Sequence, residues 1–433
     1  MKTEWLHPRA LLVQTMDRIY HYRMTTTSGG NLSVLDEEGN LWITPSRVDK
    51  GGLVEQDVVR IRTDGTAEGL HPPSSEYPFH RQIYAARPDL RAIIHAHPVA
   101  LVAFSVVRQV PDVRCFSKAL GRCSHLALAP YALPGSEELG GNIARVFSDG
   151  ADVAILENHG VVVGGRDMDE AFARFELLEF FCRSLIQAGR IGKVNQLTDA
   201  DVKALHARPE RLPEFETPGH HLPNTREKEL RGELARFIRR GYRQGLFTSV
   251  QGTFSARVDH SSFVITPKQA DRRDVTAEDF CLVRDGRVQP GREASLAARL
   301  HHAIYHHHPE INTIVNAAPP SALAFAMTDA TLDSRTIPES YLFLREVPRW
   351  SFRDVYEDFE SLAPRLTMDH PVSLVSHDGV LVLASSIFEA FDRLEVTEAT
   401  AQSLIESSAL GPVVPMDQTA ISDLRVAFGI GSA

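Results

Sequence analysis

Residues 80–98, HRQIYAARPDLRAIIHAHP, and residues 301–319, HHAIYHHHPEINTIVNAAP, carry one pattern at a distance of 221 positions (301 minus 80). In each stretch an apolar helical periodicity stops before a proline, and a short apolar run of strand length follows. Two further blocks recur in the same order, GNLS at residue 30 as GTFS at residue 252, and LENHGVVV at residue 156 as VSHDGVLV at residue 375. Three blocks at a nearly constant offset predict a tandem duplication of one domain.

Between the copies lies HARPERLPEFETPGHHLPNTRE, residues 206–227, which contains four prolines in a polar context. Proline interrupts helices and extends the chain, so this composition is typical of a linker. The sequence therefore predicts a domain over residues 1–205, a linker over 206–227 and a second domain over 228–433.

Composition narrows the class of protein. The 433 residues are 43% apolar and 24% charged, which is typical of a soluble globular chain, and the formal net charge is -10. This negative charge argues against nucleic acid and membrane surfaces as partners, because both attract clustered lysine and arginine. The chain has no apolar run of about 18 residues and no signal-peptide pattern at its start, so we expect a cytoplasmic protein.

Hairpins alternate with helices along the first copy. Turns are predicted at Gly39, at Asp64-Gly65 and at His159, each between strand-like runs. Helices are predicted near the start of the chain, from about Ser75 to just before Pro88, and over residues 167–189. This order favours an α/β layered domain with a mainly antiparallel sheet.

A metal site is the first functional hypothesis. His95 and His97 lie two positions apart at the end of a predicted strand, so their side chains face the same side of it. With His159 from a turn they could provide three imidazoles and leave a coordination position open, an arrangement suited to catalytic Zn²⁺ or another divalent transition metal. The alternative is two histidines with ordinary hydrogen bonds at a strand end.

The second copy favours the metal site. It keeps the apolar, proline and glycine positions of the scaffold, but four polar residues of the first copy are replaced together. Their counterparts are Ala297 for Glu76, Asn316 for His95, Ala318 for His97 and Asp378 for His159. Joint loss suggests that the four residues act as a unit, and predicts a second domain without a metal site.

Glu76 follows Pro72, Pro73 and two serines, a pattern typical of a helix start in which serine caps the helix and the carboxylate faces its N-terminal dipole. Hydroxyls and free N–H groups at such a start can also bind phosphate. The residues that could do so are Ser74, Ser75, Gly30, Asn31, Ser46 and Arg47. The histidine-rich residues 301–309, by contrast, align with a helix end, and we expect them to be solvated rather than metal-binding.

These motifs together resemble the class II aldolase/adducin family, in its L-fuculose-1-phosphate aldolase branch. The resemblance covers residues 8 to about 205 and includes GGNLS, ITPS, PSSExxxHxxIY, HAHP, APYALPGSEEL and ENHG in the family's order. It implies a three-layer α/β/α domain and a divalent metal, usually Zn²⁺ with Mn, Co or Fe as alternatives, held by His95, His97 and His159. It also implies that Glu76 is the acid/base and that residues 228–433 form a degenerate second copy.

The activity implied is that of a metal-dependent lyase, which cleaves a carbon-carbon bond in a small anionic substrate, a sugar phosphate or an oxo acid, through an enediolate. Glu76 would transfer the proton, and we expect burial to raise the pKa of its carboxyl group. Decarboxylase, dehydratase and epimerase reactions of the same family are alternatives, as is a non-enzymatic adducin-like interaction protein. Relatives are generally tetramers, so a homo-oligomer is expected, either a dimer that mimics a tetramer or a larger assembly.

Overall fold

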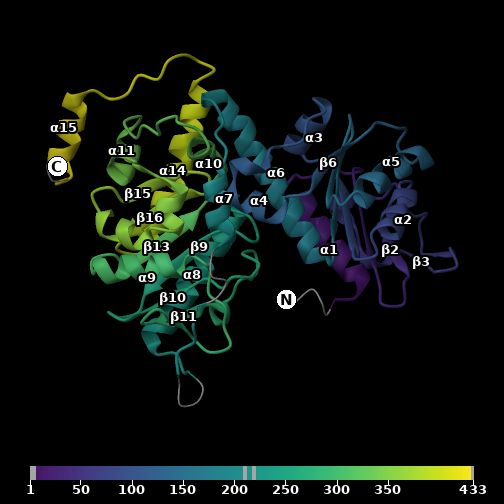
Figure 1. Cartoon of the computed structure of the whole chain (residues 1–433), viewed down its shortest axis with the longest axis horizontal. Helices are drawn as coiled ribbons and strands as arrows, with labels where there is room; N and C mark the ends of the chain where they lie inside the picture. The colour runs from purple at the N-terminus through teal and green to yellow at the C-terminus, as the bar shows by residue number, and fades with distance from the viewer. Residues whose placement is uncertain (1–5, 208–211, 217–220, 431–433) are drawn as a thin grey trace. The chain divides into compact units, whose positions relative to one another are not determined.

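Each half of the chain contains a sheet with helices around it (Figure 1). Each sheet has eight strands, and the two strand orders are the same. The computed structural model describes residues 6–207, 212–216 and 221–430. They divide into a first unit, residues 1–113 and 119–183, and a second unit, residues 114–118 and 184–433. The repeated topology confirms the predicted tandem α/β fold, while the exact domain limits at 205 and 228 remain a prediction.

The first sheet has the order β4-β3-β2-β1-β5-β8-β7-β6, in which only β6 and β7 are parallel. Its strands are β1 Asn31–Leu35, β2 Leu41–Ile43, β3 Val59–Ile61, β4 Ala67–Glu68, β5 Ala92–Ala96, β6 Leu126–Ala129, β7 Val153–Leu156 and β8 Gly160–Gly165. The helices up to residue 206 are α1 Pro8–His21, α2 Tyr77–Ala86, α3 Val99–Val106, α4 Ser117–Arg122, α5 Glu137–Ser148, α6 Met168–Ile191 and α7 Asp199–His206. Of these, α7 and the end of α6 fall in the second unit. The mainly antiparallel sheet is as predicted.

One face of this sheet packs on α2 and α5. Phe79 and Ile83 from α2 and Ile143 and Phe147 from α5 join strand residues such as Ile93 in one buried apolar cluster. The opposite face meets α1, which contacts β1, and α3, which contacts β8. Because side chains alternate along β5, Ile93 and His95 lie on the α2 face, and this alternation directs His95 toward the start of α2.

The second sheet has the order β12-β11-β10-β9-β13-β16-β15-β14 and repeats the single parallel pair. Its strands are β9 Thr253–Arg257, β10 Ser262–Ile265, β11 Cys281–Arg284, β12 Arg287–Val288, β13 Thr313–Ala317, β14 Arg349–Trp350, β15 Val372–Val375 and β16 Gly379–Ala384. The helices are α8 Thr225–Arg243, α9 Ala298–His307, α10 Pro320–Ala326, α11 Pro338–Leu344, α12 Phe352–Tyr356, α13 Phe359–Leu362, α14 Ile387–Ser407 and α15 Gln418–Ala427.

The predicted turns occur where strands reverse. Gly39 and Gly65 have φ of 82° and 86°, values that glycine adopts without a Cβ penalty, and they join β1 to β2 and β3 to β4. Asn158, with φ of 51°, lies in the turn that holds His159 between β7 and β8. None of the helices in the described ranges is long and apolar enough to span a membrane.

The start of α2 differs from the prediction. The helix begins at Tyr77 with Glu76 in the capping position, and the Glu76 side chain makes no capping hydrogen bond. The Ser74 hydroxyl accepts from the Glu76 amide at 3.3 Å, and a bridge between Pro45 and Pro73 holds the preceding segment in extended form. The Glu76 carboxylate is therefore directed away from the helix.

The predicted linker is only partly described, because residues 208–211 and 217–220 lie outside the described ranges. Of the rest, Glu214 pairs with Val288, Phe215 is buried, and residues from Thr225 onward belong to α8.

Candidate metal centre

Glu76, His95, His97 and His159 meet at one end of the first sheet. His95 is in β5, His97 follows it directly, and His159 lies in the turn between β7 and β8. Pairing of β5 with β8 places His95 opposite Val162 and brings the turn beside the end of β5. Glu76 approaches from the start of α2, so three segments that are distant in sequence converge through sheet pairing and helix packing.

The distances are those of a compact cluster. The Nε2 atoms of His95 and His97 are 3.1 Å apart, and one nitrogen from each of the three histidines falls in a group within 4.8 Å. The Glu76 carboxylate oxygens lie 3.2 Å from His95 Nε2 and 3.5 Å from His159 Nε2. Among the described residues this is the one group of three potential ligands that could hold a metal.

The hydrogen bonds around the cluster fit a metal. His95 Nδ1 lies 3.0 Å from the carbonyl of Val161. A carbonyl only accepts, so Nδ1 carries a hydrogen, and Nε2, the nitrogen left to bind a metal, is directed toward His97 and Glu76. This is the arrangement in which a metal-ligating histidine is usually held. Glu76 Oε1 is buried without a hydrogen-bond partner in the described part of the chain.

The charge state of two of the three histidines suits a metal ligand. Burial, together with the neighbouring His95, lowers the pKa of His97 to about 3 and that of His159 to about 4, so both imidazoles are neutral near pH 7. Burial also disfavours charge on His95, but the Glu76 carboxylate outweighs it and raises the His95 pKa. Neutral imidazole is the form that binds metal.

The expectation that Glu76 has a raised pKa is wrong. Burial acts in that direction, but the imidazoles of His95 and His159 and the hydrogen bond from Asn31 hold the pKa of Glu76 well below its ordinary value. Glu76 is therefore ionised at neutral pH and can accept a proton.

Two glycines make room for the cluster. A Cβ on Gly160 would lie 2.5 Å from Cδ2 of His97 and 2.7 Å from the carbonyl oxygen of Ala96. Gly30 has φ of 73°, and a Cβ there would lie 2.6 Å from the carbonyl oxygen of His95. Any larger residue at either position would push against the strand end that carries the two histidines.

The residues predicted to bind phosphate are partly brought together. The Pro45–Pro73 bridge and a bond from the Ser46 amide to the Pro72 carbonyl, 3.1 Å, place Ser46 beside the segment that carries Ser74 and Ser75. Arg47 and Ser75 are exposed. The Asn31 side chain is already engaged by Glu76 and His80, so its side-chain amide is not free for phosphate. Phosphate binding remains a prediction.

The equivalent place in the second unit has different chemistry. Asn316 Oδ1 lies 2.6 Å from His301 Nε2, and Thr253 Oγ1 lies 2.6 Å from Ser295 Oγ. Asp378 accepts from the Ser117 hydroxyl at 2.7 Å and from Lys118 Nζ at 2.9 Å, both in the short segment that belongs to this unit. One oxygen of the Asp378 carboxylate accepts both hydrogen bonds, whereas a ring nitrogen of histidine has a single lone pair and could accept only one.

The histidine-rich residues 301–309 are not uniformly solvated as expected. His301 is fully buried in the core of the second unit, whereas His306 and His307 are exposed at the end of α9. No metal-ligand group includes them within the described ranges.

Two buried polar residues of the first unit make contacts that the sequence did not predict. His80 is fully buried and contacts the side chains of Ser33 and Asn31. Lys50 is buried and donates to the Pro45 carbonyl at 2.7 Å, and burial lowers its pKa to about 8. The sequence could have indicated both, because the second copy has His301 at the position of His80 and the basic residue Arg272 at that of Lys50. Arg272 likewise donates to a proline carbonyl, that of Pro267.

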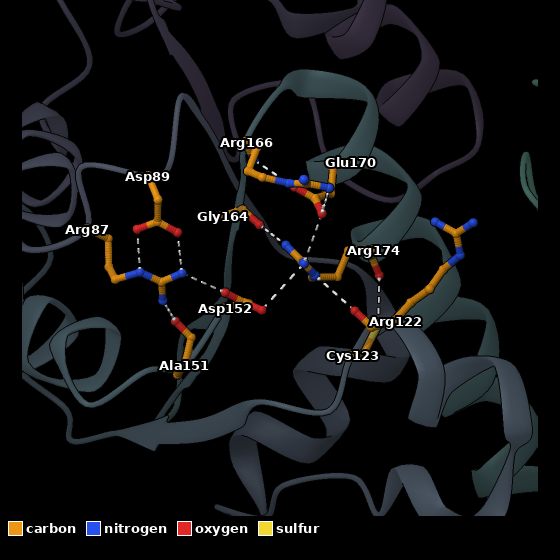
Figure 2. Close-up of polar contacts among 10 residues, drawn as sticks. All are labelled: Arg87, Asp89, Arg122, Cys123, Ala151, Asp152, Gly164, Arg166, Glu170 and Arg174. Carbon is orange, nitrogen blue, oxygen red and sulfur yellow. Dashed lines mark hydrogen bonds and ion pairs between the residues drawn. The ribbon is translucent and has the colours of Figure 1, made fainter. Parts of the chain in front are cut away.

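A cavity of about 310 Å³ lies elsewhere in the first unit, lined by Gly121, Arg122, Glu170 and Arg174, and shares no residue with the histidine cluster. Figure 2 shows Arg174 at the centre of a polar network that includes the Gly164 carbonyl and Asp152. In the second unit Arg393 makes the corresponding bond to the Leu383 carbonyl and an ion pair with Glu389. Arg174 in the first unit and Arg393 in the second therefore each join the long helix to the sheet.

Comparison with known families agrees with the repeat. The family described as Class II Aldolase and Adducin N-terminal domain matches residues 10–186 and again residues 232–405. The chain belongs to this family. The family resemblance inferred from the motifs is confirmed, and both copies of the repeat match the family.

Curated class II aldolase relatives include two kinds of enzyme. A 3-oxo-tetronate 4-phosphate decarboxylase of Escherichia coli (strain K12) is 32% identical over 158 residues, which are 36% of this chain and 74% of that protein. An L-fuculose phosphate aldolase of Methanocaldococcus jannaschii is 33% identical over 168 residues, 37% of this chain and 86% of that protein. A solved structure of L-fuculose 1-phosphate aldolase is 29% identical and covers 46% of this chain and 93% of that chain, with a TM-score of 0.42.

Class II aldolases generally depend on a divalent metal, and the three histidines of the first unit are a donor set of that kind. The general class predicted from sequence therefore fits the relatives, which are aldolases and decarboxylases.

Proposed function

We propose that the first unit is a metal-dependent lyase of the aldolase type, which cleaves a carbon-carbon bond in a small sugar phosphate or oxo acid. The observation that carries the proposal is the cluster itself: three imidazoles with ligand atoms within 4.8 Å and an ionised carboxylate 3.2 Å from one of them. The second unit has the same strand order without such a cluster, so the fold does not require these four side chains.

A divalent metal held by His95, His97 and His159 would supply Lewis acidity at the carbonyl oxygen of the substrate. The protein's own contribution is geometric. Val161 orients the His95 ring through its carbonyl, and Gly160 leaves room for His97. The low pKa of His97 and His159 keeps their rings neutral, so that no proton competes for their lone pairs.

Glu76 is placed to accept a proton, because it is ionised and lies beside the three histidines. Aldol cleavage begins when a base removes the proton of the hydroxyl group beside the breaking bond, and the carbon-carbon bond then releases an aldehyde and an enediolate. An ionised carboxylate, held by the Asn31 amide at 2.8 Å, can accept that proton and later return it to carbon. We assign Glu76 this role.

Decarboxylation is the second candidate, supported by the decarboxylases among the relatives. Loss of carbon dioxide from a 3-oxo acid needs no base, because the departing carboxylate leaves its electron pair on carbon. An ionised Glu76 would moreover repel a substrate carboxylate placed beside it. Both features favour the aldolase reaction, while dehydratase, epimerase and non-enzymatic adducin-like roles have no observation of their own.

The test combines metal content with product analysis. The purified chain should carry a divalent metal, with Zn²⁺ as the first expectation, and the double variant His95→Ala/His97→Ala should carry none. Ketose 1-phosphates should yield an aldehyde and a triose phosphate, and Glu76→Gln should lower kcat by about 100-fold, the usual contribution of a proton-transfer residue, while the metal is retained.

The matched control is Asn316→Ala/Ala318→Ser in the second unit, which changes the two counterpart positions without touching the cluster. It should leave metal content and turnover unchanged. A metal-free wild type would refute the proposal, and release of carbon dioxide from 3-oxo acids without cleavage of ketose phosphates would replace it by the decarboxylase.

Assembly is part of the same proposal. We expect a homo-oligomer, since family members generally place their sites between subunits, and sedimentation of the full chain would measure its mass. A monomer with full turnover would contradict this expectation.

A further inference from the structure

A chain of hydrogen bonds connects the core of the first unit to Glu76. The Tyr84 hydroxyl lies 2.9 Å from Ser33 Oγ, and Ser33 Oγ lies 2.7 Å from His80 Nδ1. On its other side, His80 Nε2 contacts Asn31 Oδ1, and Asn31 Nδ2 donates to Glu76 Oε2 at 2.8 Å. Two elements, β1 and α2, are thereby linked to one carboxylate oxygen in the segment before α2.

In this series of hydrogen bonds, donors and acceptors can be assigned in only one way. An ionised carboxylate only accepts hydrogen bonds, so Asn31 must present its NH₂ group to Glu76 and its oxygen to His80. His80 then carries its hydrogen on Nε2 and accepts at Nδ1 from the Ser33 hydroxyl. Burial and the nearby His95 lower the pKa of His80 to about 3, so the ring is neutral and has a single N–H to donate.

The second unit provides an internal comparison. There the Tyr305 hydroxyl lies 2.8 Å from Ser255 Oγ, and Ser255 Oγ lies 2.7 Å from His301 Nδ1, as in the first unit. The chain ends differently, because Thr253 replaces Asn31 and His301 Nε2 contacts Asn316 instead. The Tyr-Ser-His part is therefore common to the fold, and only the first unit directs it to a carboxylate.

We propose that His80 is a positioning residue for the reaction: by donating from Nε2 to Asn31 Oδ1, it fixes the amide of Asn31 so that the NH₂ group holds the Glu76 carboxylate beside His95. The inference rests on the proposed function of Glu76 and adds a residue that never touches the substrate. A buried Asn31 without this anchor could rotate its amide by 180° and present an oxygen to the carboxylate, which would repel it.

The tautomer of His80 tests the direction of the chain without any metal or substrate. Nitrogen NMR of histidine-labelled, metal-free protein should show His80, assigned by the signal that His80→Gln removes, protonated at Nε2 alone between pH 6 and 8. A ring protonated at Nδ1, or at both nitrogens, would overturn the proposal.

Variants test the consequence for turnover. His80→Leu keeps the side-chain volume but cannot donate a hydrogen bond. We expect kcat to fall about tenfold, the usual scale for a residue that orients a functional side chain, with KM and metal content unchanged. His80→Gln places an amide N–H where Nε2 was and should restore most of the loss. The control is His301→Leu, which removes the same fold contacts from the second unit and should lower the Tm but not kcat.

A fall in Tm for His80→Leu like that of His301→Leu, with kcat unchanged, would show that His80 serves only the fold. Should the wild type have no lyase activity at all, the proposed function fails, while the tautomer measurement still decides how the chain of hydrogen bonds runs.

Discussion

At the scale of single residues, Gly160 shows how closely the cluster is packed. Replacement by alanine would place a Cβ 2.5 Å from the His97 ring and 2.7 Å from a backbone carbonyl oxygen, and the backbone cannot yield easily. We expect Gly160→Ala to weaken metal affinity by 10- to 100-fold and to cost about 1–3 kcal/mol in the free energy of unfolding. Chelator competition and urea unfolding measure the two effects.

Gly141→Ala is the matched control, because a Cβ there meets nothing within 4 Å and the residue lies inside α5. It should leave metal affinity unchanged and stabilise the chain by roughly 0.5–1 kcal/mol. Metal binding by Gly160→Ala as tight as that of wild type would contradict the packing argument.

Prediction at this scale succeeded for the conspicuous residues. His95, His97, His159 and Glu76 were proposed as a group from their joint loss in the second copy, and the fold brings them together, although their roles stay predictions. The role of His80 was not predicted, because its side-chain contacts join positions 47 and 49 residues apart, which periodicity does not reveal. The low pKa of Glu76 was missed for the same reason, since it depends on imidazoles that only the fold places nearby.

At the scale of elements, each long helix caps a shorter one. Glu179 in α6 accepts from the amides of Ala100 and Leu101 at the start of α3, and Glu398 in α14 accepts from the amides of Ser321 and Ala322 at the start of α10. These carboxylates satisfy N–H groups that the short helices leave without partners. The first copy adds Arg183 as an ion-pair partner, whereas position 402 is glutamine in the second.

The pH dependence of the second domain should follow Glu398. Burial raises its pKa to about 7 from an ordinary value of 4.5. Below pH 4.5 the group is protonated in both states, but between pH 4.5 and 7 the unfolded chain loses the proton first, so stability falls as pH rises. The total loss is about 3 kcal/mol, complete above pH 7.

Urea unfolding at pH 5, 6, 7 and 8 measures this slope. Glu398→Gln cannot ionise, so the decline between pH 5 and 7 should be smaller by about 2–3 kcal/mol than in wild type. Glu406→Gln, an exposed position on the same helix, should keep the wild-type slope. Equal slopes for all three proteins would refute the assignment.

Elements were predicted well where local chemistry decides them. The glycine turns at 39 and 65 and the alternating apolar runs gave the hairpins of β1–β2 and β3–β4 correctly. The start of α2 was placed too early because Ser74 and Ser75 resemble caps, whereas a bridge to Pro45, far away in sequence, holds that segment extended. Local signals cannot report such a distant constraint.

At the scale of the whole molecule, the two copies share the fold but differ in the residues of the candidate metal site. Both copies keep the strand order, the Tyr-Ser-His contacts and the buried capping glutamates, while one copy alone has the metal-ligand group among the described residues. We therefore predict one divalent metal for each 433-residue chain. Elemental analysis of the purified protein checks this number, and two metals per chain would refute it.

The same reasoning predicts what a second site would need. The substitutions Ala297→Glu, Asn316→His, Ala318→His and Asp378→His restore the four side chains, but Gln251 stands where the first copy has Gly29 (251 minus 222). At Gly29 even a Cβ would lie 3.2 Å from Nδ1 of His97, so the longer glutamine should exclude the new histidine at 318. The fourfold variant should still bind one metal, and adding Gln251→Gly should raise the content toward two. Two metals in the fourfold variant would show that space at this glycine does not limit the site.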